Sequence, residues 1–586
     1  MQLTMTKRFE YKDLPDMASI FHEAEKIAGR ISVGKTLFFE KYGVSSEWEY
    51  KIAAMRNGTI CKHSHIGWNS WDETARNVEY IYRELERRNS YITRMGFIFD
   101  WVMGVPAEYR RNMQRGTGLI FETPDEWREL GRIAPIQPHL SDHMIGAPNA
   151  LENTVLGLQA GVTSIGNVSH YFTYEYPGIE LERERTVNSL VAFALMGKIP
   201  GTIIHSNLDD GYGNQMHDLA NLVGWAMIER YLVEELLGAC MTFSYGNLFS
   251  DPVSRIVFNM AMDAGNTKGV PGTMTFGNTI DYGLDLSRNY GALSSFSLAD
   301  AVCQRHKPTG HAVSAVPVSE AQRIPTPDEI VDAHLCIDMM IKKSQLLEPY
   351  MNWSAIEARR DVLVACGSVF FERVMNGLDD LGVDPRHAGE VFACLKSIGA
   401  AQLEEKFGVG RREKTALRGR VPVCPTDIVR TLQQRQTRIF SGMDASQQLT
   451  GMNVIVGSTD IHDYGKEMIK TLFLRAGAHV FDLGTYITAQ EVVDNVIETE
   501  CSVVAISTYN GIALSFGREL MRQLQEAGCH PFCIFGGLLN ENRNGGLLAE
   551  DVSEELRALG INCDNDMEKI VPAILRHFSK ESGDAH

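Results

Sequence analysis

The chain has 586 residues, several times the usual domain size of roughly 100 to 200 residues, so two or more domains are expected. Hydrophobic residues make up 44% and charged residues 22%, and no run reaches the roughly 20 continuous apolar residues of a membrane span, which excludes a disordered chain and a membrane protein. The 56 Lys and Arg against 74 Asp and Glu give a net charge of -18, which repels phosphate backbones and excludes a nucleic-acid partner.

Neither end of the sequence carries a targeting signal, since the first residues have no apolar signal-peptide core and the last match no lipidation or retention motif. We therefore expect a cytoplasmic protein. The 11 cysteines are scattered without paired spacing, which indicates reduced thiols. Cys529 and Cys533 form a close pair, but neither a third cluster ligand nor a second zinc-binding pair accompanies them.

Short β-rich runs alternate with helical stretches from Gly58 onward, after a helical extension over the first 55 residues. This alternation is typical of parallel strands joined by helical crossovers. About eight units favour a (β/α)8 TIM barrel within an α/β protein, so one of nine candidate runs is surplus. The runs are Thr59–Cys61, Gly96–Phe99, Gly118–Phe121, Ala134–Gln137, Val162–Ile165, Gly201–Ile204, Cys240–Phe243, Gly272–Phe276 and Ala312–Val316.

Apolar residues recur at spacings of three and four between Ile330 and Phe407, which predicts helices packed beside the barrel. Segment 408–425 is rich in glycine and arginine and breaks this periodicity. We interpret it as an exposed connection, with binding of a phosphate or carboxylate as the alternative. The predicted division is a helical extension (1–55), a TIM-barrel catalytic domain (56–345), a helical region and linker (346–440) and a C-terminal domain (441–586).

The C-terminal domain starts a second alternation of strands and helices. Four strand-like runs, MNVIVGSTD, AHVFDLGT, CSVVAIST and PFCIFGG, are separated by helical segments. This order predicts a flavodoxin-like (Rossmann-like) domain, in which ligands bind beyond the carboxyl ends of the strands.

The motif Asp460-x-His462-x-x-Gly465 follows the first strand of this domain. An imidazole at that edge, two residues from a carboxylate that can hold its other ring nitrogen, has the design of a metal ligand with a supporting partner. Gly465 lets the chain turn tightly into a helix.

D-x-H-x-x-G is the motif of the cobalamin-binding domain of base-off, His-on B12 enzymes, which this domain resembles. Ser507 and Tyr509 follow the third strand where that family has S-x-L, and Gly536 and Gly537 follow the fourth where it has a glycine pair. The resemblance implies that His462 is the lower cobalt ligand, tuned by Asp460, and that the other stations hold the nucleotide tail. A flavodoxin-like domain with an incidental surface histidine is the alternative.

The segment Ser319–Thr326, with residues 130–345 in general, resembles the large subunit of glutamate mutase, an adenosylcobalamin-dependent carbon-skeleton mutase. Glu320 falls where that family has a glutamate that holds the adenosyl ribose. The alternative for Glu320 is a glutamate favoured by a helix N-terminus. Gly166 or Asn167 stands where the family places a glutamate beside the substrate amino group, and an expected arginine is missing, so glutamate is not the expected substrate.

Polar residues gather where the predicted barrel strands end, which is where the catalytic groups of such barrels collect. We therefore expect several of them to line a substrate pocket, although each alone is more often structural. A metal pair formed by His63 and His65 is a further alternative. Tyr171 belongs to an aromatic run that either packs the mouth or excludes water. The candidate catalytic residues are His139, His143, His170, His205, Tyr171 and Asn207.

The sequence thus predicts an adenosylcobalamin-dependent radical isomerase of a small polar carboxylate or amino acid. A cobalamin-dependent methyltransferase and a non-catalytic B12 carrier or sensor remain alternatives. An aminomutase would also need pyridoxal phosphate, with Lys466 as its candidate lysine. The resemblance implies a homodimer and leaves open a reactivating chaperone as a partner.

Overall fold

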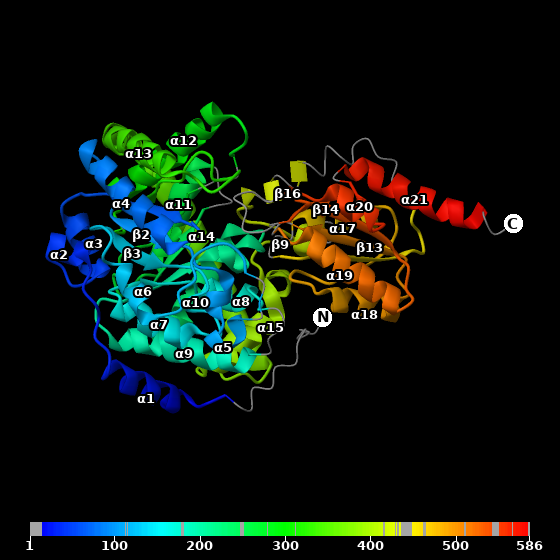
Figure 1. Ribbon diagram of the computed structural model, residues 1–586, viewed down its shortest axis with the longest axis horizontal. Coiled ribbons are helices and arrows are strands. Elements are labelled where there is room, and N and C mark those ends of the chain that lie inside the picture. Colours follow the sequence, from blue (N-terminus) through cyan, green and yellow to red (C-terminus); the bar gives the residue numbers. More distant parts are fainter. Residues whose placement is uncertain are drawn as a thin grey trace. The chain divides into compact units, whose positions relative to one another are not determined.

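The protein, in a computed structural model, divides into two compact units, residues 1–427 and 428–586. Figure 1 shows the first unit in blue to yellow and the second mainly in orange and red. The structure describes residues 14–111, 113, 115–176, 181–246, 251–277, 279, 281–310, 312–413, 416–427, 429–430, 433–434, 448–460, 464–508, 511–541, 550–564 and 566–583.

Eight parallel strands form the core of the first unit. They are hydrogen-bonded in the order β7-β6-β5-β4-β3-β2-β1-β8, and no ladder joins β7 to β8 within the described residues, so the sheet is a nearly closed barrel. The surplus run is Gly118–Phe121, of which Leu119 makes a single bridge to Phe99. The strands are β1 (Cys61–Ile66), β2 (Arg94–Phe97), β3 (Gln137–Leu140), β4 (Ser164–Ile165), β5 (Ile203–Asn207), β6 (Met241–Tyr245), β7 (Met274–Thr275) and β8 (Ala312–Ser314).

Helices connect the strands and surround the barrel (Figure 1). Their boundaries follow capping residues: Thr326 and Glu329 form a capping box at the start of α13, with Pro327 in its first turn. The helices that follow the barrel strands are α4 (Trp71–Arg87), α5 (Ala107–Arg110), α6 (Pro124–Glu129), α7 (Ala150–Gln159), α8 (Ser169–Thr173), α9 (Glu182–Lys198), α10 (Leu219–Arg230), α11 (Pro252–Ala264), α12 (Leu286–His306) and α13 (Pro327–Leu347).

Three N-terminal helices, α1 (Met17–Ala28), α2 (Leu37–Tyr42) and α3 (Glu47–Arg56), precede the barrel. Helix α3 lies across the amino-terminal ends of the strands. The Glu47 carboxylate pairs with Arg94 of β2 at 3.3 Å, and its backbone N–H donates to Thr163 just before β4 at 3.0 Å. The helix therefore forms the floor of the barrel.

Two further helices, α14 (Trp353–Asp380) and α15 (Ala388–Phe407), pack on the outside of the barrel. The buried Glu404 of α15 accepts hydrogen bonds from the backbone N–H groups of His217 and Asp218 and from Asn221 at 2.9–3.0 Å. These bonds satisfy the start of α10 and attach the helical segment to the barrel.

The second unit has a parallel sheet in the order β12-β11-β13-β14-β17. That order corresponds to 2-1-3-4-5 along the unit, the flavodoxin-like arrangement, so the predicted parallel α/β domain is confirmed. Its elements are β11 (Asn453–Ser458), α17 (Tyr464–Arg475), β12 (His479–Asp482), α18 (Ala489–Thr499), β13 (Val503–Thr508), α19 (Ala513–Glu526), β14 (Phe532–Gly537), α20 (Ser553–Ala558), β17 (Asn562–Cys563) and α21 (Met567–Gly583).

Side chains of this sheet alternate between two separate apolar cores. Val454 and Val456 of β11 pack with α17 and α21, whereas Ile455 packs with α18 and α19. Both faces of the sheet are therefore covered by helices, which explains the continuous apolar runs of its strands.

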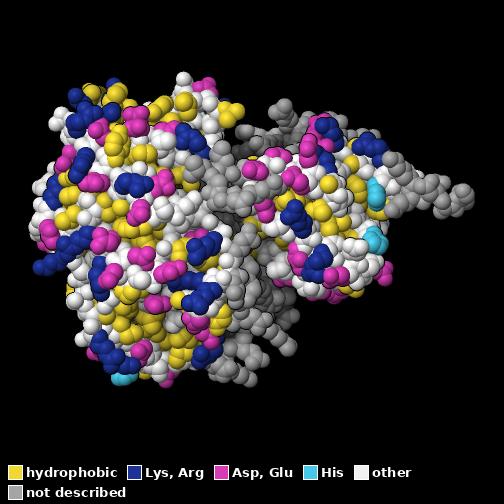
Figure 2. All heavy atoms as spheres, in the orientation of Figure 1, with side chains coloured by type: hydrophobic (Ala, Val, Ile, Leu, Met, Phe, Trp, Pro, Cys, Tyr) yellow, Lys and Arg dark blue, Asp and Glu magenta, His cyan; other side chains and the backbone are white. Residues whose placement is uncertain are grey.

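The face shown in Figure 2 carries acidic and basic side chains side by side over the first unit, without a large area of one sign. Within the residues that the structure describes, no helix is both long enough and apolar enough to cross a membrane.

Candidate functional site

A cavity of about 50 Å³ opens at the carboxyl edge of β13 and β14 in the second unit, between α17 and α21. Gly465, Ser507, Gly536 and Gly537, four of the predicted cofactor-binding residues, line it. Isoleucine and methionine side chains of the sheet, α17 and α21 make up most of the remaining wall. Gly465 of the motif, Ser507 and the glycine pair thus meet at one largely apolar cavity.

Two of these glycines leave little or no room for a side chain, and the limit is strict at Gly537, where the obstacle is backbone. A Cβ on Gly465 would lie 2.4 Å from Ser507 Oγ, and one on Gly537 would lie 2.3 Å from the Thr508 carbonyl oxygen. Gly537 also has a φ of +96°, in the region that favours glycine. The bare backbone and the largely apolar wall suit a ligand group that passes close to the main chain, as the nucleotide tail of a cobalamin would, and the cavity of about 50 Å³ must widen to admit it.

Asp460 lies two residues beyond the end of β11 and is buried. His462 and Tyr509 lie outside the described residues, so the predicted cobalt ligand has no geometry here. Lys466 is buried, and its ammonium pairs with Glu467 at 2.8 Å and with Asp482 at 2.9 Å. Lys466 is the lysine that a pyridoxal phosphate cofactor would need, and its ammonium group is already held by these two ion pairs.

Four histidines fill the barrel interior: His63, His65, His139 and His205. The ring centroids of His63 and His65 are 4.8 Å apart, and those of His139 and His205 are 5.1 Å apart. Burial, with the nearby charge of Arg94, lowers the pKa of His65 to about 3 and that of His139 and His205 well below the ordinary value. The interior is therefore polar, and the imidazoles of His65, His139 and His205 are uncharged.

A hydrogen-bond chain leads from this interior to the mouth of the barrel. His205 Nε2 lies 2.9 Å from Ser244 Oγ, and the Ser244 hydroxyl donates to Asn207 Oδ1 at 2.8 Å. The Asn207 amide then donates to Asp210 Oδ2 at 2.7 Å. Two predicted catalytic residues, His205 and Asn207, thus hold Asp210 in place.

The mouth brings His143 and His170 together with two acidic residues. The two imidazole centroids are 4.9 Å apart, and His170 Nε2 lies 3.8 Å from Asp142 and 3.9 Å from Asp210. Tyr174 stacks on His170 with 5.3 Å between centroids. His143 has a φ of +61°, so its backbone is strained at the mouth, as functional residues often are.

Both mouth carboxylates resist ionisation. Partial burial raises the pKa of Asp142 to about 6. Burial and the neighbouring Asp142 charge raise the pKa of Asp210 well above its ordinary value, although Asn207 and Asn167 oppose the shift. Two carboxyl groups this close favour a shared proton or a bound cation.

The remaining predicted residues lie apart from this cluster. Tyr171 is buried, its hydroxyl lies 2.7 Å from Thr186 Oγ1, and its ring packs against Phe392 of α15. Its contacts are those of a core residue. Glu320 is exposed in the turn after β8.

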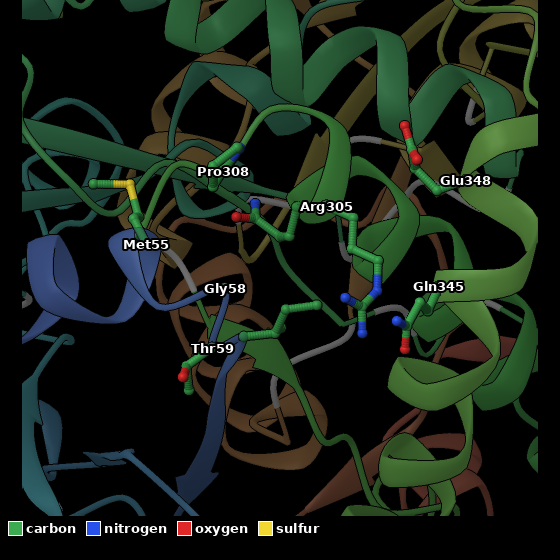
Figure 3. A pocket seen from close by; sticks show the side chains of 10 residues that line it. Met55, Gly58, Thr59, Arg305, Pro308, Gln345 and Glu348 are labelled. Atoms are coloured by element: carbon green, nitrogen blue, oxygen red, sulfur yellow. The ribbon is translucent and has the colours of Figure 1, made fainter.

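A larger cavity, of about 310 Å³, lies at the opposite end of the barrel. Figure 3 shows its walls: Gly58 and Thr59 precede β1, and Pro308 precedes β8. Arg305 points along one wall and donates to Ser344 Oγ at 2.6 Å. Because catalytic groups of such barrels occupy the other end, we do not assign the substrate to this cavity.

Sequence reasoning left Asp142 and Asp210 out of the candidate catalytic set. Asp142 directly precedes His143 after β3, and Asp210 belongs to the polar loop after β5. Their positions just beyond strand ends were the available signal. What the sequence did not show is that the two loops meet at His170.

Residues 452–575 match the family described as B12 binding domain. This segment is a B12-binding domain. The match covers the motif, the sheet and the glycine-lined cavity of the second unit.

The relatives of this domain include mutase and corrinoid proteins. A stretch is 28% identical to glutamate mutase sigma subunit 2 of Haloarcula marismortui, over 22% of this chain and 88% of that protein. Fused isobutyryl-CoA mutase of Cupriavidus metallidurans is 28% identical over 17% of this chain and 9% of its own length. Dimethylamine corrinoid protein 1 of Methanosarcina mazei is 30% identical over 15% of this chain and 41% of its own length.

A solved cobalamin-binding protein from Desulfitobacterium hafniense DCB-2 is 22% identical, with a TM-score of 0.19 over 25% of this chain and 68% of that one. The chain thus spans less than half of the isobutyryl-CoA mutase and the dimethylamine corrinoid protein that it matches.

Proposed function

We propose that the protein is an adenosylcobalamin-dependent isomerase (mutase) that acts on a small polar carboxylate or amino acid other than glutamate. The observation that carries the proposal is one chain joining a B12-binding domain to a barrel with a polar, histidine-rich interior. Two relatives of the domain are named as mutases. We further propose a cytoplasmic homodimer.

Adenosylcobalamin, when bound, supplies a 5'-deoxyadenosyl radical by homolysis of its cobalt–carbon bond. Residues of the second unit would hold the cofactor: His462 at cobalt, Asp460 behind it, and Gly465, Ser507, Tyr509, Gly536 and Gly537 along its tail. Glu320 would position the adenosyl ribose.

Residues of the barrel have a different task, which is to hold the substrate and keep water away. The neutral imidazoles of the interior donate or accept hydrogen bonds without adding charge. Tyr174 and Tyr176 lie beside His143, with Tyr174 at 4.4 Å between centroids, and cover one side of the mouth with aromatic surface.

A cobalamin-dependent methyltransferase is the second candidate, favoured by the similarity to dimethylamine corrinoid protein 1. It would transfer a methyl group and pass through Co(I), whereas the isomerase forms Co(II) only with its substrate. A non-catalytic carrier would bind cobalamin, and its barrel would bind none of the small molecules.

Anaerobic EPR of the full chain with adenosylcobalamin tests the proposal, with and without pooled small amino, hydroxy and dicarboxylic acids. We expect a substrate-dependent Co(II)–radical signal from the wild type and from His479→Ala, a change of an exposed histidine in the same unit. His462→Ala should lose the signal. A Co(I) cycle with a methyl donor and no radical from any pool would favour the methyltransferase instead.

A further inference from the structure

Asp142 and Asp210 face each other across His170 at the mouth of the barrel. Their side chains are 29% and 32% exposed, so a ligand in the mouth can reach both carboxylates. The His170 side chain is 7% exposed, and its Nε2 faces the two carboxylates at 3.8 and 3.9 Å. Those separations exceed hydrogen-bonding distance, and no described residue gives this nitrogen a hydrogen bond.

The tautomer of His170 follows from its other nitrogen. The backbone N–H of His143 donates to His170 Nδ1 at 3.3 Å, so Nδ1 carries no proton. Burial and the charge of Arg185 lower the pKa of His170 to about 3, so the ring is neutral and its proton is on Nε2. His170 Nε2–H is therefore a hydrogen-bond donor at the mouth, between the carboxyl groups of Asp142 and Asp210.

This tautomer argues against a divalent metal ion at the cluster. A metal-bound histidine offers an unprotonated nitrogen to the ion and donates its other N–H to an acceptor. In His170 the unprotonated nitrogen is turned to the backbone, and the nitrogen at the carboxylates holds the proton. An organic cation, which needs only the carboxylates, fits better.

Asp210 is preset as a hydrogen-bond acceptor. Asn167 and Asn207 both donate to its Oδ2 at 2.7 Å. The orientation of the Asn167 amide is fixed, because its oxygen accepts the backbone N–H groups of Ser169 and Asn207. Two donors at one oxygen stabilise a carboxylate and leave further acceptor capacity for a ligand.

The cations near this region already have partners. The buried guanidinium of Arg185 donates to the carbonyl oxygens of Gly146 and Tyr174 at 2.9 and 2.7 Å and pairs with Glu182. Lys396 pairs with Glu182 at 2.7 Å. The other titratable groups that interact electrostatically with the cluster are Asp209, His143, Tyr174 and Tyr176, and Asp100 in turn acts on Tyr174.

We propose that Asp142 and Asp210 bind the protonated amino group of the substrate, while His170 Nε2–H donates to an oxygen on the neighbouring carbon. The substrate class is then a primary amine with an adjacent oxygen, either an amino alcohol or an α-amino acid. This inference rests on the proposed isomerase activity, since that activity is what makes the bound amine a substrate. The binding site itself belongs to the barrel.

Calorimetry on the full chain without cobalamin tests the site directly. We expect 2-aminoethanol, alanine or both to bind at least about tenfold more tightly than propylammonium, which lacks the oxygen, and than lactate, which lacks the amine. The tighter of the two amines identifies the oxygen as hydroxyl or carboxylate. Equal binding of propylammonium would overturn the His170 contact, and preferred binding of lactate would overturn the amine site.

Proton release gives a readout that needs no variant. Burial raises the pKa of Asp142 to about 6 and that of Asp210 well above its ordinary value, so the pair is partly protonated near pH 6.5. Amine binding at that pH should therefore release up to about one proton, seen as a difference in binding heat between phosphate and MES buffers, neither of which is a primary amine. Binding without proton release would contradict the proposal. So would stoichiometric binding of Mn²⁺ at the same residues.

Variants assign the effect to the cluster. Asp142→Asn and Asp210→Asn should each weaken amine binding at least about tenfold, whereas Asp361→Asn, on the exposed face of α14, should not. His170→Phe should retain amine binding but lose the preference for an adjacent oxygen, which a merely structural role would not produce. Circular dichroism and thermal melting verify folding of each variant.

The two proposals fail in different ways. If amines bind as described but no substrate-dependent radical forms, the isomerase is wrong and the amine site stands. If only amine-free acids give the radical, the amine site is wrong and the isomerase stands.

Discussion

Asp142 connects stability with pH at the scale of one residue. Its folded-state pKa of about 6 exceeds the value of roughly 3.9 expected for an unfolded chain, so the folded protein binds more protons between these values. The free energy of unfolding should therefore fall as the pH rises from about 4 to 6. The same carboxylate that suits a cationic ligand thus costs stability in the free protein.

We predict that Asp142→Asn stabilises the first unit by about 1 kcal/mol at pH 8, a figure discounted for partial exposure, and has little effect at pH 4.5. Urea unfolding at the two pH values measures the difference. Asp361→Asn is the control. An equal gain at both pH values would mean that the Asp142 pKa is not the cause.

A second prediction for a single residue concerns Gly537. Gly537→Ala should weaken cobalamin binding at least about tenfold, because its Cβ would meet the Thr508 carbonyl oxygen at the cavity wall. Gly560 shares a positive φ of +88° but has open space around its Cβ position. Gly560→Ala should therefore lower the free energy of unfolding by about 1 kcal/mol, from its positive φ alone, and retain cobalamin binding. Absorbance titration with cobalamin separates the two; equal affinities would contradict the cavity assignment.

The residue types of the site were predictable, but their partners were not. His143 and His170 were expected at the mouth because both follow predicted strands. The tautomer of His170 depends on a backbone N–H of the loop after β3, and the orientation of Asp210 depends on an asparagine after β4. Such contacts join loops that are far apart in sequence, so one-dimensional patterns do not contain them.

Helix α3 carries a prediction at the scale of an element. Glu47, with 2% of its side chain exposed, pairs with Lys51 at 2.7 Å and with Arg94 at 3.3 Å. Burial opposes ionisation of Glu47, but these two cations outweigh it and hold its pKa below the ordinary value. The floor of the barrel therefore depends on one carboxylate between two buried cations.

Glu47→Gln should cost about 3 to 5 kcal/mol, because it leaves Lys51 and Arg94 buried without a counter-charge. The exposed pair of Lys41 and Glu86 gives a matched control, and Glu86→Gln should cost less than about 1 kcal/mol. Urea unfolding measures both. A loss for Glu47→Gln no larger than that of the control would show that α3 is not held by this triad.

The barrel strands were predicted at the right places but with shifted ends. β1 was predicted as Thr59–Cys61 and in fact runs from Cys61 to Ile66. The strand contains His63, Ser64 and His65, and such polar residues are unusual in a buried strand. The two-residue strands β4 and β7 were predicted too long, because the β-rich runs include flanking residues such as Val162 and Phe276 that lie outside the paired segments.

At the scale of the whole molecule, each unit has its own apolar core. The clusters on the two faces of the second sheet contain residues of 449–578 only, and the large barrel cluster contains none of these. Cores that share no residues are the physical basis of independent domains. The chain is therefore expected to unfold in two steps.

Ligands provide the test of that independence. Differential scanning calorimetry of the full chain should show two transitions, and cobalamin at 100 times its dissociation constant should stabilise only one of them, by about 2.7 kcal/mol. His462→Ala should abolish that shift, while an amine ligand of the barrel should raise only the other transition. A single transition raised by both ligands would mean that the units unfold together. Two transitions that respond separately would leave the substrate site and the cofactor site as independent binding events, coupled only through the chemistry.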